Sequence, residues 1–263
     1  MEATSRPRVA VHKFSSCDGC QLALLNLGEP LLELAERVDL VHFAEAGPFD
    51  LDTEIDIAFV EGSVSTPEDL DRIREIRANS RVLISIGACA TTGGIQGLRN
   101  GADAAAWIAG IYDHPEAIAS LPRSSPISEH VKVDFEVWGC PVSGRQMLAV
   151  VNALLLGVAP RDNADKVCTE CKRLGYPCVM VTRGIACMGP VTRAGCGALC
   201  PGLGRDCYGC YGPAENGNTD SLSARFRGLG LDDSAVARRF QSINSQAPIF
   251  LAAANKAEAG RDE

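Results

Sequence analysis

The sequence predicts an α/β protein with a doubly wound parallel sheet, followed by a small loop-rich part. Short apolar runs alternate with helical patterns as far as about residue 158, and eight cysteines with many glycines and prolines follow between residues 168 and 210. Strands that alternate with helices are typical of an open parallel sheet with helices on both faces. At 263 residues, the chain can form one large domain or a medium domain with an appendage.

Five short apolar runs predict the strands of this sheet. The run over residues 81–86 is nearly continuous, as is typical of a strand buried on both faces. The five expected strands cover residues 9–14, 38–43, 55–60, 81–86 and 133–138.

Helical patterns fill the segments between these strands. Seven leucines favour a helix over residues 21–35. Thr66 followed by Pro67 is typical of a helix N-terminus, with threonine as the cap and proline in the first turn. The remaining expected helices cover residues 103–110, 143–156, 220–226 and 234–240.

These patterns divide the chain into three expected parts. Residues 1–160 hold the predicted sheet, and residues 161–213 hold the cysteine-rich, loop-built segment. Residues 214–263 are polar and weakly patterned, so we expect a helical appendage that packs on the chain or on a partner.

Charge and hydropathy argue against several classes of function. The net charge of −8 argues against nucleic acid or an anionic membrane surface as the main partner. The longest largely apolar run, residues 147–159, is shorter than the roughly 20 residues of a membrane span. The N-terminal residues show neither a secretion leader nor a twin-arginine pair, so we expect a soluble cytoplasmic protein. Clustered thiols in that compartment are more often metal ligands than disulfides.

Four cysteines follow the ends of three predicted strands. Cys17 and Cys20 form a CxxC pair after the first strand, Cys89 follows the fourth, and Cys140 follows the fifth. Doubly wound sheets place ligands at the carboxyl ends of their strands, so we expect the four thiols to converge on one site. Four buried small side chains would be the alternative. The adjacent glycines, which would allow the backbone to approach an inorganic cluster closely, are Gly19, Gly87, Gly93, Gly94 and Gly139.

The other eight cysteines are expected to form two four-thiolate sites. No histidine lies among them, and either two zinc ions or two iron-sulfur clusters match their number. Only two CxxC pairs occur, and the wider spacings resemble those of two-cluster ferredoxins, which favours iron-sulfur and leaves the pairing of individual cysteines open. The eight are Cys168, Cys171, Cys178, Cys187, Cys196, Cys200, Cys207 and Cys210.

An ordered set of motifs resembles those of the small, electron-transferring subunit of nickel-iron hydrogenases. The resemblance covers about residues 8–213, and its later part is similar to cytoplasmic multimeric hydrogenases that couple to a nicotinamide or other soluble carrier, including the delta subunit of sulfhydrogenases. The motifs are Cys17-Asp18-Gly19-Cys20-Gln21, Val60-Glu61-Gly62-Ser63, Gly87-Ala88-Cys89-Ala90, Gly139-Cys140-Pro141, the stretch from Cys187 to Gly197, and the stretch from Cys207 to Pro213.

This resemblance implies a flavodoxin-like domain in which Cys17, Cys20, Cys89 and Cys140 hold a proximal 4Fe-4S cluster. That cluster would face a nickel-iron centre on a separate large subunit. Two more 4Fe-4S clusters in a ferredoxin-like second domain would lead to a partner that binds flavin (FAD) and NAD(P), with an additional iron-sulfur subunit in the complex. The chain would then conduct electrons within an H2:NAD(P)+ oxidoreductase whose active site lies on another subunit.

Glu61 ends the third predicted strand, and the resemblance associates its position with proton movement between subunits. We therefore expect a possible proton-relay role, and a carboxylate that only hydrogen-bonds the neighbouring loop is the alternative. Two other functions remain open. One is a cysteine-rich zinc-binding or ferredoxin-like module with a scaffolding role. The other is a quinone-reductase subunit like that of respiratory complex I, which has adjacent cysteines where this chain has Cys17 and Cys20 separated by two residues.

Overall fold

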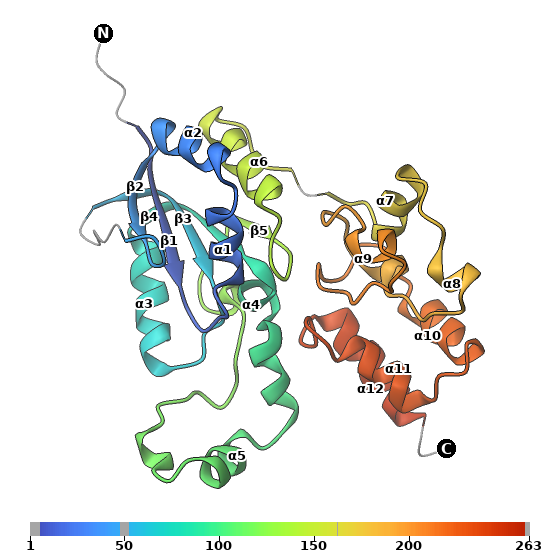
Figure 1. Ribbon diagram of the computed structural model, residues 1–263. Coiled ribbons are helices and arrows are strands. Elements are labelled where there is room, and N and C mark those ends of the chain that lie inside the picture. The colour runs from blue at the N-terminus through green and yellow to red at the C-terminus, as the bar shows by residue number, and fades with distance from the viewer. Residues whose placement is uncertain (1–5, 48–52, 162, 261–263) are drawn as a thin grey trace. The chain divides into compact units, whose positions relative to one another are not determined.

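The chain forms two compact units, one up to Pro160 and one from Arg161 onward, in a computed structural model that describes residues 6–47, 53–161 and 163–260. Figure 1 colours the N-terminal unit from blue to green and the C-terminal unit from yellow to red. Residues 1–5 lie outside the described residues. They are part of the N-terminal stretch from which we expected no leader. The three-part division expected from the sequence stays a prediction.

A five-stranded parallel sheet forms the centre of the N-terminal unit. Its strand order, β2-β1-β3-β4-β5, is that of flavodoxin-like doubly wound sheets. Every pairing is parallel, so all carboxyl ends of the strands lie at one edge, and the predicted α/β parallel sheet is confirmed. The strands are β1 (Arg8–Lys13), β2 (Asp39–Phe43), β3 (Ile55–Glu61), β4 (Ser80–Ile86) and β5 (Phe135–Val137).

Helices cover both faces of the sheet, which explains why the central strands are apolar on both sides (Figure 1). On one face, Met147 of α6 (Gly144–Leu155) and Leu24 pack with Val11 and Phe59. On the other face, Ile73 of α3 (Pro67–Ala78) packs with alternate residues of the same strands, among them Ala10 and Val60.

The single helix expected over residues 21–35 is wrong, because the chain breaks it into two. The first, α1, covers Gly19–Leu25, and the second, α2, covers Glu29–Arg37. Gly28 between them has a φ of 67°, which lies in the left-handed region that glycine adopts without strain, and Pro30 lies in the first turn of α2. The break places the start of α1 directly after the Cys17 loop.

Between β4 and β5 the chain makes a long excursion of short helices. The predicted helix at 103–110 is confirmed as α5, and the strand expected at 133–138 shortens to the three residues of β5. The elements of the excursion are α4 (Gly87–Thr92), η1 (Gly94–Gly101), α5 (Ala104–Ile111), η2 (Pro115–Ala117) and η3 (Ile127–Glu129).

The C-terminal unit consists of short helices and loops. Its described residues, 161 and 163–260, contain no β-strand, only isolated bridges such as Lys166 with Arg193. Among the described residues of the whole chain, none of the helices has the length and apolar character to span a membrane. The helices are α7 (Val167–Arg173), α8 (Val179–Thr182), η4 (Gly189–Val191), α9 (Leu199–Gly202), α10 (Thr219–Gly228), α11 (Asp233–Phe240) and α12 (Pro248–Ala259).

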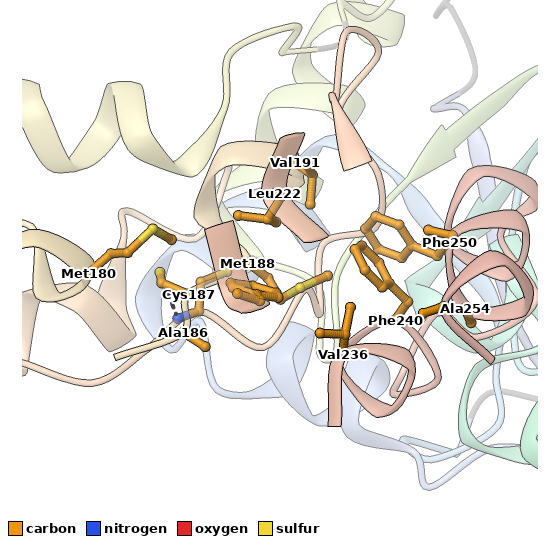
Figure 2. Close-up of a cluster of buried hydrophobic side chains, with 14 of the residues drawn as sticks. Met180, Ala186, Cys187, Met188, Val191, Leu222, Val236, Phe240, Phe250 and Ala254 are labelled. Atoms are coloured by element: carbon orange, nitrogen blue, oxygen red, sulfur yellow. Dashed lines mark hydrogen bonds between the residues drawn. The ribbon is translucent and has the colours of Figure 1, made fainter. Parts of the chain in front are cut away.

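One hydrophobic core joins the cysteine-rich segment to the C-terminal helices. Figure 2 shows Met188 and Val191, which belong to the cysteine-rich segment, among Leu222, Phe240 and Phe250 from the last three helices. The rings of Phe240 and Phe250 lie tilted to each other, with their centroids 5.8 Å apart. The C-terminal helices therefore supply a large part of the apolar support for the cysteine loops.

The N-terminus of α3 offers a test of how local sequence stabilises the N-terminal unit. The Thr66 hydroxyl accepts a hydrogen bond from the Asp69 amide at 3.2 Å, and the Asp69 carboxylate accepts one from the Thr66 amide at 3.0 Å. Thr66→Ala should lower the free energy of unfolding by about 1 kcal/mol, because an amide loses its cap. Urea unfolding followed by tryptophan fluorescence measures this, since both tryptophans lie in the N-terminal unit.

Ser143→Ala is the matched control for this substitution. Ser143 also caps a helix, α6, but its side chain makes no cap hydrogen bond. An equal loss of stability in the two variants would contradict the role assigned to Thr66.

Candidate metal centres

The carboxyl edge of the sheet brings together four thiols that lie up to 123 residues apart in the sequence. Cys89 lies in α4 directly after β4, and Cys140 follows β5. Cys17 lies in the loop after β1, and Cys20 lies in the first turn of α1. Charge on Cys140 and Cys17 raises the pKa of Cys89, and charge on Cys89 and Cys140 raises that of Cys20, as is expected for thiols that share one site. That they hold a cluster stays a prediction.

Burial controls the protonation of these thiols. It is the largest cause that raises the pKa of Cys89 to about 12, and it also raises the pKa of Cys20 and Cys140. When free, the thiols of Cys20, Cys89 and Cys140 are therefore neutral at pH 7. Only thiolates ligate iron or zinc, so metal binding at this edge must release protons and compensate for the burial.

Two glycines lie so close to the sulfurs that a side chain at either position would collide with them. A Cβ atom at Gly87 would lie 2.4 Å from Cys20 Sγ, and one at Gly94 would lie 2.6 Å from Cys89 Sγ. At Gly19 the corresponding distance to Cys17 Sγ is 3.4 Å. Gly93 and Gly139 instead face backbone atoms, so they serve the shape of the loops. The arrangement fits a bulky inorganic group held by four thiolates with backbone close by.

Glu61 connects the CxxC loop to the central strand. Its Oε1 accepts a hydrogen bond from the Cys20 amide and its Oε2 accepts one from Gln21 Nε2, both at 3.0 Å. Burial is the main cause that raises the pKa of Glu61, although these two hydrogen bonds lower it. The structure thus shows the loop-bonding role that the sequence left as the alternative, and it leaves a proton-relay role untested.

The sequence did not predict that two histidines, one from each of two neighbouring strands, lie in contact. His12 of β1 and His42 of β2 stack with ring centroids 4.7 Å apart, beside a cavity of about 470 Å³ that Arg72 also lines. Burial, the charge of His42 and that of Arg72 lower the pKa of His12 to about 3, so its ring stays neutral. Only the register of two adjacent strands pairs these positions, and no local motif marks them.

In the C-terminal unit, charge effects link Cys168, Cys171, Cys178 and Cys187, which are called the first set below. The charges of Cys187, Cys171 and Cys178 add to burial in raising the pKa of Cys168 to about 11. Burial and the charges of Cys187, Cys178 and Cys196 likewise raise the pKa of Cys171 to about 11. A Cβ at Gly189 would lie 3.3 Å from Cys168 Sγ and 3.5 Å from Cys187 Sγ, so glycine again lies against paired sulfurs.

Cys196, Cys200, Cys207 and Cys210 remain as a second set. Burial raises the pKa of Cys207, and charge on Cys187 and on Cys210 raises it further. The Cys207 amide donates a hydrogen bond to Cys187 Sγ at 3.2 Å, so the two sets meet here. The Gly209 amide donates to Cys207 Sγ at 3.5 Å, and amides also lower the pKa of Cys196, against the effect of burial. Such amide donors stabilise thiolates. Among the described residues, no three His, Cys, Asp or Glu side chains are grouped around a position for a single metal ion.

The C-terminal helices hold the loop that carries Cys207 and Cys210. The buried side chain of Asn244 donates a hydrogen bond to the Gly209 carbonyl at 2.8 Å. Arg239 of α11 pairs with Asp206 at 2.5 Å. The segment expected as an appendage is therefore a direct support of this cysteine pair, which its polar sequence did not indicate.

Comparison with known proteins relates this chain to oxidoreductase and hydrogenase subunits. Residues 17–154 match the family described as NADH ubiquinone oxidoreductase, 20 Kd subunit. The chain is 34% identical to the sulfhydrogenase 2 subunit delta of Pyrococcus furiosus over 236 residues, which cover 90% of this chain and 98% of that protein. It is 32% identical to a subunit of the F420-non-reducing hydrogenase of Methanocaldococcus jannaschii, over 79% of this chain and 82% of that one.

A solved structure agrees with these sequence relatives. A chain from an NAD+-reducing NiFe-hydrogenase in the H2-reduced state superposes with a TM-score of 0.55 and 27% identity. The superposition covers 59% of this chain and 94% of that chain.

Gly87 offers a test of the four-thiol site in the N-terminal unit. Gly87→Ala should remove about four irons per chain, because the new Cβ would displace the Cys20 sulfur and strain a residue with a φ of 84°. Iron analysis of the purified protein measures this loss. Gly157→Ala is the control, since Gly157 also has a positive φ, 67°, and a Cβ there meets nothing within 4 Å. Full iron content in Gly87→Ala would contradict the proposed cluster position.

Proposed function

Because the chain belongs to the family of the NADH ubiquinone oxidoreductase 20 Kd subunit, with hydrogenase subunits among its relatives, we propose that it is the electron-transfer small subunit of a NiFe-hydrogenase complex. The observation that carries the proposal is the convergence of Cys17, Cys20, Cys89 and Cys140 at the carboxyl edge of the sheet. Hydrogen would react on another subunit, and electrons would pass through this one.

Three 4Fe-4S clusters would account for all 12 cysteines. When bound, such a cluster accepts and donates one electron at a time, at a potential set by charge, amide hydrogen bonds and solvent access. The protein's own contribution is to hold four thiolates per cluster and to supply those amides. Glycine at positions 87 and 94 keeps space at the sulfurs, and Gly209 donates to Cys207.

The eight C-terminal cysteines divide into two ligand sets in this proposal. The charge effects of Cys187 and Cys178 on Cys168 and Cys171 support one cluster on Cys168, Cys171, Cys178 and Cys187. Charge effects also cross the two sets, because Cys187 acts on Cys207 and Cys196 acts on Cys171. The second cluster would then take the remaining four, Cys196, Cys200, Cys207 and Cys210. In this proposal the pairing would follow the order of the chain. The hydrogen bond from the Cys207 amide to Cys187 Sγ at 3.2 Å is the observation that favours the alternative, a crossed pairing.

The partners follow from the proposed order of the clusters along the electron path. The four-thiol site in the N-terminal unit would face a large subunit with the nickel-iron centre. The two clusters of the C-terminal unit, including the exposed Cys178, would face an additional iron-sulfur subunit or a flavin- and NAD(P)-binding subunit. The relative from an NAD+-reducing NiFe-hydrogenase supports a nicotinamide as the final acceptor in a cytoplasmic complex.

Glu61 would contribute to proton movement at the same edge of the sheet. Its buried carboxylate ends β3 and is held by the Cys20 amide and the Gln21 side chain. A carboxylate fixed beside the site can accept and return a proton without large motion.

Loss of one ligand should interrupt the proposed route. Cys17→Ser or Cys89→Ser in the assembled complex should abolish reduction of the soluble carrier by H2, because the cluster between the nickel-iron centre and the C-terminal unit is lost. Carrier reduction is followed spectrophotometrically, and hydrogen–deuterium exchange at the large subunit serves as the control that its own site is intact. Unchanged carrier reduction in a fully assembled variant would contradict the proposal.

Pairs of substitutions test the two ligand sets in the C-terminal unit. Cys168→Ser with Cys187→Ser should remove about four irons, no more than either change alone, because both residues serve one cluster. Cys168→Ser with Cys207→Ser should remove about eight. Iron analysis of the double variants distinguishes the sets, and the reverse result would mean that the ligands cross between clusters.

A further inference from the structure

Glu170 lies between the two ligands of a CxxC pair and reaches the loop of the other cysteine set. It belongs to α7, between Cys168 and Cys171. Its Oε1 accepts hydrogen bonds from the Gly195 amide at 2.9 Å and from the Gly197 amide at 3.2 Å. Its Oε2 accepts a third hydrogen bond, from the Ala198 amide at 3.0 Å. Three backbone amides therefore donate to this one carboxylate.

The loop that Glu170 holds adopts an unfavourable backbone conformation. Gly195 and Gly197 have φ values of 133° and 67°, and Ala198, which is fully buried, has a φ of 51°. A residue with a Cβ rarely adopts this region unless its surroundings fix it. The carboxylate supplies that fixation and thereby sets the position of Cys196, which lies within the same loop.

The charge of Glu170 acts on both cysteine sets. It raises the pKa of Cys171, a member of the first set, although burial and neighbouring thiols have larger effects there. It also raises the pKa of Cys196, a member of the second set, after burial as the main cause. The Cys196 sulfur lies 3.9 Å from Oε2. A negative charge so close to both sets opposes the addition of further negative charge to either.

We propose that Glu170 is a positioning residue for both clusters of the C-terminal unit. Glu170 holds the Cys196 loop, and its fixed negative charge makes both clusters harder to reduce. The inference rests on the proposed function, since it requires clusters at these thiols. Lys172 lowers the pKa of Cys168, and Asp206 raises that of Cys187. Glu170 differs from these two residues because its carboxylate also binds the amides of the Cys196 loop.

An anaerobic redox titration of the holo-complex, followed by electron paramagnetic resonance, tests the electrostatic part. Glu170→Gln keeps an oxygen that can accept from Gly195 and Gly197 but removes the charge. The midpoint potentials of the two C-terminal clusters should shift to more positive values, while that of the cluster on Cys17 and Cys89 stays unchanged. Glu258→Gln, an exposed glutamate of α12 that contacts Gln241, is the control and should shift neither. Wild-type potentials in Glu170→Gln would overturn the inference.

A second pair of variants tests the positioning part. Glu170→Ala should lose about four irons per chain, because the Cys196 loop is released. Adding Ala198→Gly should restore the iron, since glycine adopts a φ of 51° without strain, but the potentials should stay shifted because the charge is still absent. Full iron and wild-type potentials in Glu170→Ala would overturn the proposal. A wild-type complex without reducible iron would instead overturn the proposed function itself.

Discussion

The hydrogen bond from the Cys20 amide to Glu61 is the contact on which the N-terminal site depends. Glu61 ends β3, the central strand, and its carboxylate holds the CxxC loop over the end of the sheet. Because all five strands are parallel, the loops after β1, β4 and β5 reach the same edge. A buried carboxylate without these donors would be costly, so the loop and the strand end stabilise each other.

The two units build cysteine sites in different ways. In the N-terminal unit, a regular sheet brings distant thiols together, and glycines such as Gly87 occupy positions where a side chain would collide with a sulfur. In the C-terminal unit, short helices and loops carry the thiols, and the shape of the loops depends on side chains from elsewhere. Glu170 binds the amides of one loop, and Asn244 binds the carbonyl of another. A loop-built site therefore requires the helices after residue 214, which complete its hydrophobic core.

Features that depend on local chemistry could be predicted from the sequence, and those that depend on distant contacts could not. The parallel sheet and the cap at Thr66 follow from periodicity and from side chains that act within a few residues. The helix break was missed because seven leucines outweighed Gly28, although that glycine and Pro30 were visible signals. The pairing of His12 with His42 depends on strand register, and the contacts of Glu170 and Asn244 depend on chain folding across 25 to 35 residues.

The most direct test of the account is the iron and acid-labile sulfide content of the anaerobically purified complex, assigned to this chain. If the 12 cysteines form three four-thiolate cluster sites, we expect about twelve irons and about twelve sulfides per chain. Zinc in place of iron, or iron without labile sulfide, would contradict the account.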